Sequence, residues 1–139
     1  MSLVKQIDHI AIAVNDIGES SRFFVDVLGL EVSAPQDVAE QKTRVAFVQI
    51  GEVRIELVQP MSDDSPVAKF IAKRGQGIHH VAYETGDLVA ALDALKEKDV
   101  PLIDKEPRVG AHDARIAFVH PKGVSGVLTE LCEHNQKRS

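Results

Sequence analysis

The chain of 139 residues has one cysteine, no tryptophan, one tyrosine and no long apolar run. A single cysteine excludes an intrachain disulfide framework and is typical of a reducing compartment, so we expect a cytoplasmic protein. Asp8 and His9 interrupt the apolar N-terminal run, which predicts neither a signal peptide nor a membrane span. Few aromatic residues and a net charge of −5 argue against nucleic acid or an anionic membrane as a partner.

Several motifs of catalysis and nucleotide binding are also absent. No G-x-G-x-x-G follows an expected strand, and the chain has neither a Walker phosphate loop nor a G-x-S-x-G nucleophile elbow. The segment HHVAYE (79–84) lacks the H-E-x-x-H spacing of zinc peptidases. An apolar fraction of 44% is enough for a hydrophobic core, and the length fits one domain or two small halves that share a core.

The sequence contains an internal repeat. Three segments of the first half recur in the same order in the second half, with an offset of 71 residues from His9 to His80 and 74 residues from Glu56 to Glu130. The extra residues fall in a turn, where insertions cost little. The aligned pairs are DHIAIAVNDIGESSRFF with HHVAYETGDLVAALDAL, TRVAFVQIG with ARIAFVHPKG, and VRIELV with VLTELC.

Each half predicts the order β-α-β-β-β. We expect strands at 7–14, 31–34, 43–50 and 53–58 in the first half. In the second half we expect a strand that begins at His79, followed by strands at 102–104, 114–119 and 126–132. The fold class expected is therefore α+β, with two βαβββ modules. We expect the modules to be related by a pseudo-two-fold axis and to form a curved mixed sheet around a metal site. We expect one domain over residues 1–139, with module 1 at about 6–60, a linker helix at about 61–76 and module 2 at about 77–132.

Capping residues and apolar spacing predict three helices. Asp16 and Asp87 are expected N-caps in the two modules, and Ser65-Pro66 starts the linker helix. Gly29 and Gly75 are the expected stops. The apolar sides are expected to carry Phe23, Phe24, Val27 and Leu28 in the first helix, Val67, Phe70 and Ile71 in the linker, and Leu88, Ala91, Leu92 and Leu95 in the last helix.

The repeat turns isolated polar residues into a set. His9 and His80 occupy equivalent places in the first strand of each module, and Glu56 and Glu130 do so in the last strand. A lone strand histidine or glutamate is usually a hydrogen-bonded or exposed residue, but these strands are apolar enough to be half-buried, and a buried carboxylate needs a partner. Two imidazoles and two carboxylates suit one divalent metal such as Zn²⁺, Ni²⁺, Co²⁺ or Mn²⁺.

The other histidines and the cysteine receive different assignments. His79 aligns with Asp8 and not with His9, so it points to the opposite face, and we expect it either to be structural or to support a metal ligand from behind. His112, His120 and His134 have no repeat partners and are expected at the surface, His120 in a turn. Cys132 is expected to be a packed thiol.

Paired βαβββ modules with His on the first strand and Glu on the last resemble the vicinal-oxygen-chelate (glyoxalase/bleomycin-resistance) superfamily. Within it, the chain is similar to methylmalonyl-CoA epimerases. The specific segments are the linker DDSPVAKFIAKRGQGIHHVAY and GAHDARIAFVHPKGVSGVLTEL, whereas FFVDVLG is shared by many superfamily members.

The resemblance implies epimerisation of methylmalonyl-CoA by proton removal and return beside the thioester, through a metal-stabilised enediolate. It places the metal ligands at His9, Glu56, His80 and Glu130, and we expect Glu130 and Glu56 to act as the bases. It also implies an acyl-CoA substrate and a homodimer. Some epimerases carry a further carboxylate base where this chain has Val45, and Glu40 is a nearby candidate. The cations considered for the CoA phosphates are Lys42, Lys122 and Arg108.

Two alternatives stay open. Some epimerases have Gln where this chain has Glu56, and glutamate there equally resembles glyoxalase I, which acts on a hemithioacetal of glutathione. A non-catalytic ligand-binding or resistance protein of the same fold is the second alternative, and the intact set of four metal-ligand residues argues against it. A dioxygenase of this superfamily would need Fe²⁺ and a 2-His-1-carboxylate face, and such enzymes are longer.

Overall fold

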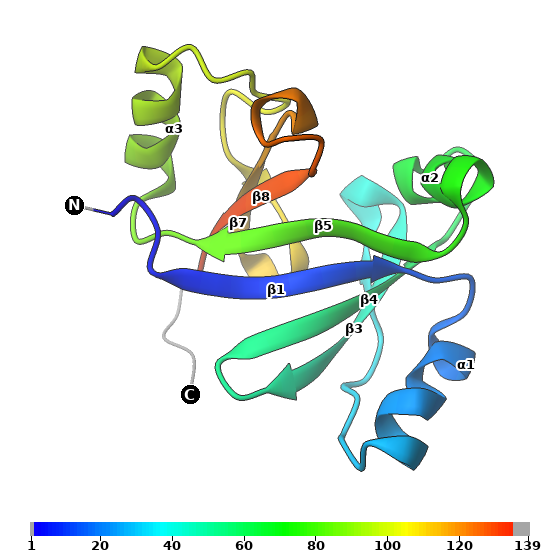
Figure 1. The fold of residues 1–139 in the computed structure, drawn as a ribbon. Coiled ribbons are helices and arrows are strands. Elements are labelled where there is room, and N and C mark those ends of the chain that lie inside the picture. Colours follow the sequence, from blue (N-terminus) through cyan, green and yellow to red (C-terminus); the bar gives the residue numbers. More distant parts are fainter. Residues whose placement is uncertain (1, 135–139) are drawn as a thin grey trace. The chain divides into compact units, whose positions relative to one another are not determined.

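A computed structural model describes residues 2–134 of the chain (Figure 1). Residues 9–79 form one compact unit, called here the first unit. The described residues among 1–8 and 80–139 form the second unit. The strands are β1 (Gln6–Ala13), β2 (Gln36–Val38), β3 (Thr43–Ile50), β4 (Val53–Pro60), β5 (Gly77–Glu84), β6 (Arg108–Val109), β7 (Arg115–Val119) and β8 (Thr129–Glu133), and the α-helices are α1 (Ile17–Arg22), α2 (Pro66–Arg74) and α3 (Leu88–Glu97).

The two units contain the same strand pattern. In the first, the order is β2-β3-β4-β1, with β1 and β4 parallel and the other pairs antiparallel. In the second, the order is β5-β8-β7-β6, with β5 and β8 parallel and the other pairs antiparallel. The predicted pair of mixed-sheet βαβββ modules is therefore confirmed. The strands β1 and β5 each contribute residues to both units.

The register of the strands reproduces the sequence repeat residue by residue. Phe47 lies opposite Glu56 in the first unit, and Phe118 lies opposite Glu130 in the second. On the parallel side, Ala11 is the partner of Glu56, and Ala82 is the partner of Glu130. The equivalence of the two halves, which the alignment predicted, thus extends to the strand partners of both glutamates.

The three predicted helix starts are confirmed. Asp16 Oδ2 accepts from the Glu19 N–H at 2.8 Å, Ser65 Oγ accepts from the Ala68 N–H at 3.0 Å, and Asp87 Oδ1 accepts from the Ala90 N–H at 3.0 Å. These side chains satisfy backbone donors that a helix leaves without partners at its start. Gly29 and Gly75 have φ values of 72° and 77°, which glycine adopts without strain.

The helices bury their apolar sides to different extents. In α3, Leu88, Ala91 and Leu92 are fully buried and pack with Ala117, Val119 and Leu131 of β7 and β8. The linker helix α2 buries Val67 and half-buries Phe70 and Ile71. None of the described helices is long and apolar enough to cross a membrane.

The first helix differs from the prediction. Beyond Arg22 it continues as a π-helical turn over Phe23–Val27. Only Phe24 packs against the core of the first unit, whereas Phe23, Val27 and Leu28 are 54%, 69% and 50% exposed. A π-helical turn places side chains at angles different from those of a regular α-helix, so the 3.6-residue spacing predicted the wrong buried face.

Two expected strands are also wrong. The segments at 31–34 and 102–104 each make only one isolated bridge, Val32 with Val48 and Leu102 with Val119. Pro35 and Pro101 border these segments, and proline has no N–H to donate to a ladder. The short strands β2 and β6 form instead.

Candidate metal-binding and active-site residues

His9 and Glu56 form a buried pair in the first unit. Their exposed fractions are 5% and 6%, and His9 Nε2 lies 3.4 Å from Glu56 Oε1. His9 belongs to β1 and Glu56 to the neighbouring parallel strand β4. Ala11 and Ala13, which share the face of His9, are fully buried, so small side chains flank the pair.

His80 and Glu130 repeat this pair in the second unit. Both residues are 5% exposed, and His80 Nε2 lies 3.4 Å from Glu130 Oε1. His80 belongs to β5 and Glu130 to the parallel strand β8. Ala82, which is fully buried, takes the place that Ala11 has in the first unit.

The N–O distance of 3.4 Å in both pairs suits two ligands of one metal ion better than a direct hydrogen bond. It exceeds the usual length of a hydrogen bond. Two ligands that each bind one ion at about 2.1 Å with a tetrahedral angle between them lie about 3.4 Å apart. Each pair therefore offers an imidazole nitrogen and a carboxylate oxygen at a spacing that suits a divalent metal, and a buried carboxylate benefits from a cation.

A phenylalanine and an arginine accompany each pair. In the first unit, the Phe47 ring meets His9 edge-on at 6.2 Å, and the Arg54 guanidinium carbon lies 4.1 Å from the centre of the Phe47 ring. In the second unit, Phe118 meets His80 edge-on at 5.3 Å, and Arg108 lies 5.2 Å from the Phe118 ring.

The contacts of these two phenylalanines were not predicted from the sequence, although the two residues align in the repeat. The two arginines do not align, since Arg54 lies on β4 and Arg108 on β6. Only the packing shows that each unit has a cation beside its histidine and glutamate.

The other cations named from the sequence lie elsewhere. Lys42 binds Asp64, and the hydrogen bonds from Lys42 and then Ser62 lower the pKa of Asp64 to about 2. Lys122 is exposed in the turn 121–123. Of the three cations, Arg108 is therefore the one that shares an aromatic neighbour with His80.

The structure does not support an additional base at Glu40 or at the position of Val45. Glu40 is exposed in a short 3-10 turn, and Val45 is a buried apolar residue of β3. Val45 lies two residues from Phe47, so the face of β3 beside Glu56 presents an apolar side chain there.

His79 packs on the linker helix. Its ring meets that of Phe70 edge-on at 4.9 Å, which agrees with the structural role expected for it. His112 and His120 are exposed as predicted, and the His120 Nδ1 accepts from the Lys122 N–H at 3.0 Å.

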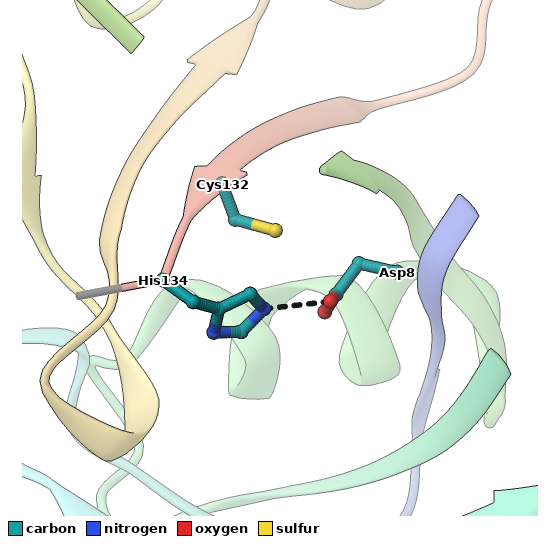
Figure 2. Close-up of side chains that lie close together, drawn as sticks. All are labelled: Asp8, Cys132 and His134. Atoms are coloured by element: carbon teal, nitrogen blue, oxygen red, sulfur yellow. Dashed lines mark hydrogen bonds and ion pairs between the residues drawn. The ribbon is translucent and has the colours of Figure 1, made fainter. Parts of the chain in front are cut away.

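The surface location predicted for His134 is wrong. Its Nε2 lies 2.7 Å from Asp8 Oδ1, and its side chain is only 14% exposed (Figure 2). Cys132 is packed as expected, with an exposed fraction of 1%, but it lies next to Asp8 and His134. Burial, together with the negative charges of Asp8, Glu130 and Glu84, raises the pKa of the Cys132 thiol. The available sequence signal was Cys-x-His, because alternate strand residues project to the same side.

An open hollow of about 320 Å³ lies in the first unit, on the other side of the sheet from the His9–Glu56 pair. Ile12 and Leu57 line it, and they lie an odd number of residues from His9 on β1 and from Glu56 on β4, so they point to the opposite face. The hollow is therefore separate from the pair.

Known proteins of similar sequence and fold indicate the family of this chain. The model of the glyoxalase/bleomycin resistance protein/dioxygenase superfamily matches residues 8–118. An uncharacterized protein of Bacillus subtilis, YqjC, is 46% identical over 94% of this chain and 93% of its own length. The ethylmalonyl-CoA/methylmalonyl-CoA epimerase of Cereibacter sphaeroides is 39% identical over 93% and 98% of the two chains.

A solved structure of methylmalonyl-CoA epimerase in complex with methylmalonyl-CoA and NH4⁺ superposes with a TM-score of 0.92 at 38% identity, and 99% of each chain is covered. Identity at this level along nearly the whole length shows that the chain belongs to the methylmalonyl-CoA epimerases, a family of racemase/epimerase enzymes within the glyoxalase/bleomycin resistance protein/dioxygenase superfamily.

Proposed function

We propose that this protein epimerises methylmalonyl-CoA in a metal-dependent reaction. Two findings support the proposal: the similarity to epimerases that act on this substrate, and the recurrence in both units of a buried His–Glu pair with an N–O distance of 3.4 Å. The second finding supports the metal-dependent mechanism, because the two pairs provide donor atoms for a metal and carboxylates that can accept and return a proton.

His9, Glu56, His80 and Glu130 would together hold one divalent ion, which is Co²⁺, Zn²⁺, Ni²⁺ or Mn²⁺. The equivalence of the two pairs in the repeat supports a shared ion, and both pairs combine nitrogen with oxygen donors. When bound, such an ion supplies Lewis-acid stabilisation of the negative charge of the enediolate that forms on deprotonation. The remaining tasks are the removal of a proton, its return and the placement of the substrate.

Inversion of the carbon between the thioester and the carboxylate needs a proton to leave one face and another to arrive on the opposite face. Glu130 and Glu56 are the candidates for these two steps. Both carboxylates are more than nine-tenths buried, which limits competing proton exchange with water. Val45 cannot exchange a proton, so the nearest part of β3 does not supply a base.

Arg54 and Arg108 are suited to bind the anionic groups of an acyl-CoA. Each guanidinium lies over a phenylalanine that also contacts a ligand histidine. A guanidinium keeps its charge at all physiological pH values and can bind a carboxylate or phosphate through two hydrogen bonds. We propose that Arg108, which is exposed, contacts the CoA portion.

The decisive experiment is deuterium incorporation at the α-carbon. The purified chain is freed of metal, supplied with each divalent metal in turn, and incubated in D2O with methylmalonyl-CoA and separately with the methylglyoxal–glutathione hemithioacetal. Epimerase function predicts α-deuteration and loss of optical purity of the CoA ester with at least one metal. Turnover of the hemithioacetal without deuteration of the CoA ester would establish glyoxalase I instead, and binding without turnover would establish a ligand-binding protein.

A homodimer and a cytoplasmic location stay predictions. Sedimentation velocity of the purified chain over a range of concentrations tests the first, and fractionation of cells that express the chain tests the second.

A further inference from the structure

A second cluster of metal-ligating side chains lies outside the two His–Glu pairs. Asp8, Cys132 and His134 each offer one donor atom, and these atoms all lie within 4.8 Å of one another. All three residues belong to the second unit. Figure 2 shows the Cys132 thiol and the His134 ring directed toward the Asp8 carboxylate.

The sequence and the fold place these residues together in a simple way. Cys132 lies in β8, and His134 follows the end of that strand, so their side chains project to the same side. Asp8 belongs to the N-terminal segment, which is tied to the second unit. The Lys5 N–H donates to Glu84 O at 2.8 Å, and Thr85 Oγ1 donates to Leu3 O at 2.8 Å.

The surroundings of the cluster favour a cation. Asp8 is fully buried, and its Oδ1 already lies 2.7 Å from His134 Nε2, so an oxygen and a nitrogen donor meet in a buried place. Cys132 is 1% exposed, so its sulfur adds a third kind of donor to the same buried cluster. A combination of thiolate, imidazole and carboxylate selects Zn²⁺ and chemically similar ions over Mg²⁺ and Ca²⁺, which prefer oxygen ligands.

We propose that Asp8, Cys132 and His134 form a second metal site, separate from the His–Glu pairs, for a thiophilic divalent cation such as Zn²⁺. Coordination replaces the thiol proton of Cys132 by a sulfur–metal bond, and the proton passes to solvent. His134 binds through the lone pair of Nε2 and carries its ring proton on Nδ1. The fourth position of a tetrahedral ion is taken by water, which the partly exposed side of His134 admits.

Binding requires small movements of the side chains. Oxygen and nitrogen ligands of a tetrahedral zinc ion lie roughly 3.3 Å apart. The Asp8 Oδ1 and His134 Nε2 atoms, now 2.7 Å apart, would separate by about 0.6 Å. The ion would connect the N-terminal segment to the end of β8, so its role is structural and does not depend on the proposed epimerase activity.

Cobalt(II) absorption tests this site selectively, because only a thiolate ligand gives strong sulfur-to-cobalt charge transfer in the near ultraviolet. The four residues of the His–Glu pairs carry only nitrogen and oxygen donors and cannot produce that band. The metal-free full chain is titrated with Co²⁺ and then with Zn²⁺ as competitor. The variants are Cys132→Ser, which removes the thiolate, and His134→Asn, with His120→Asn as the matched control on an exposed histidine of the same unit.

The proposal predicts a charge-transfer band in the unmodified chain that saturates once the Cys132 cluster and the His–Glu residues are both filled with Co²⁺, and that disappears on addition of Zn²⁺. The band is absent in Cys132→Ser, needs at least about tenfold more Co²⁺ in His134→Asn, and is unchanged in His120→Asn. Absence of the band in the unmodified chain would overturn the proposal, as would an equal titration of His134→Asn. In either case the three residues are a hydrogen-bonded group only. Far-ultraviolet circular dichroism of each variant establishes that it is folded.

Discussion

Replacement of Glu56 by glutamine separates its two proposed tasks, metal ligation and proton transfer. The amide has nearly the shape of the carboxylate and keeps an oxygen donor, so we expect Glu56→Gln to retain the metal. An amide side chain cannot act as a base that accepts and returns a proton at neutral pH. Since Glu56 is 6% exposed, water has little access to replace the carboxylate in that task.

A positioned acid–base group typically contributes about 10²- to 10⁴-fold to a rate. Loss of Glu56 should therefore raise the barrier to inversion by about 2.7–5.4 kcal/mol, since each tenfold change corresponds to about 1.36 kcal/mol. The exchange of a proton that faces Glu130 should continue, because the 3.4 Å pair of Glu130 with His80 is unchanged. We thus expect one epimer of methylmalonyl-CoA to exchange its α-hydrogen with retention of configuration.

The assay combines chiral analysis of the CoA ester with mass spectrometry after incubation of each epimer in D2O. Glu130→Gln is the matched variant, and it should reverse the preference, with exchange retained for the other epimer. Metal content is measured for both variants. Inversion by Glu56→Gln at a rate close to that of the unmodified chain, with full metal content, would refute the role of Glu56 in proton transfer.

Three further predictions follow from the structure. Treatment with a strong chelator should abolish epimerisation, and re-addition of one divalent metal should restore it; activity unaffected by complete metal removal contradicts the ligand assignment. Arg108→Gln should raise KM for methylmalonyl-CoA with little change in kcat, whereas Lys42→Gln, whose partner is Asp64, should leave both unchanged, and equal effects would exclude a specific role for Arg108. Leu92→Ala should lower the free energy of unfolding by about 2–5 kcal/mol in urea melts, because Leu92 is 1% exposed in the α3 core, while Val89→Ala at a 47% exposed position of the same helix should cost much less.

Much of the fold could be predicted because the relevant information is local or repeated. Asp16, Ser65 and Asp87 cap helices through hydrogen bonds from backbone N–H groups three positions further along the chain. Such short spacing can be recognised in a sequence. The pairing of Phe47 with Glu56 recurs as that of Phe118 with Glu130, as the alignment of the halves predicts for equivalent strands. The same alignment separated His80 from His79.

Features that have neither a local periodic pattern nor an equivalent in the other half could not be predicted from the sequence and became evident only in the tertiary structure. The π-helical turn that exposes Phe23 and the two prolines that shorten predicted strands changed packing in ways that apolar spacing does not record. The placement of Arg54 and Arg108 over phenylalanines depends on side-chain packing between different strands.

The two modules, the helix starts and the four residues proposed as metal ligands could all be predicted from the sequence, because each rests on spacing within one segment or on equivalence between the halves. Only the tertiary structure brought Asp8 beside Cys132 and His134, more than 120 positions along the chain. No periodic pattern links residues so far apart. Their contact arises because the N-terminal segment packs with the last strand in the second unit.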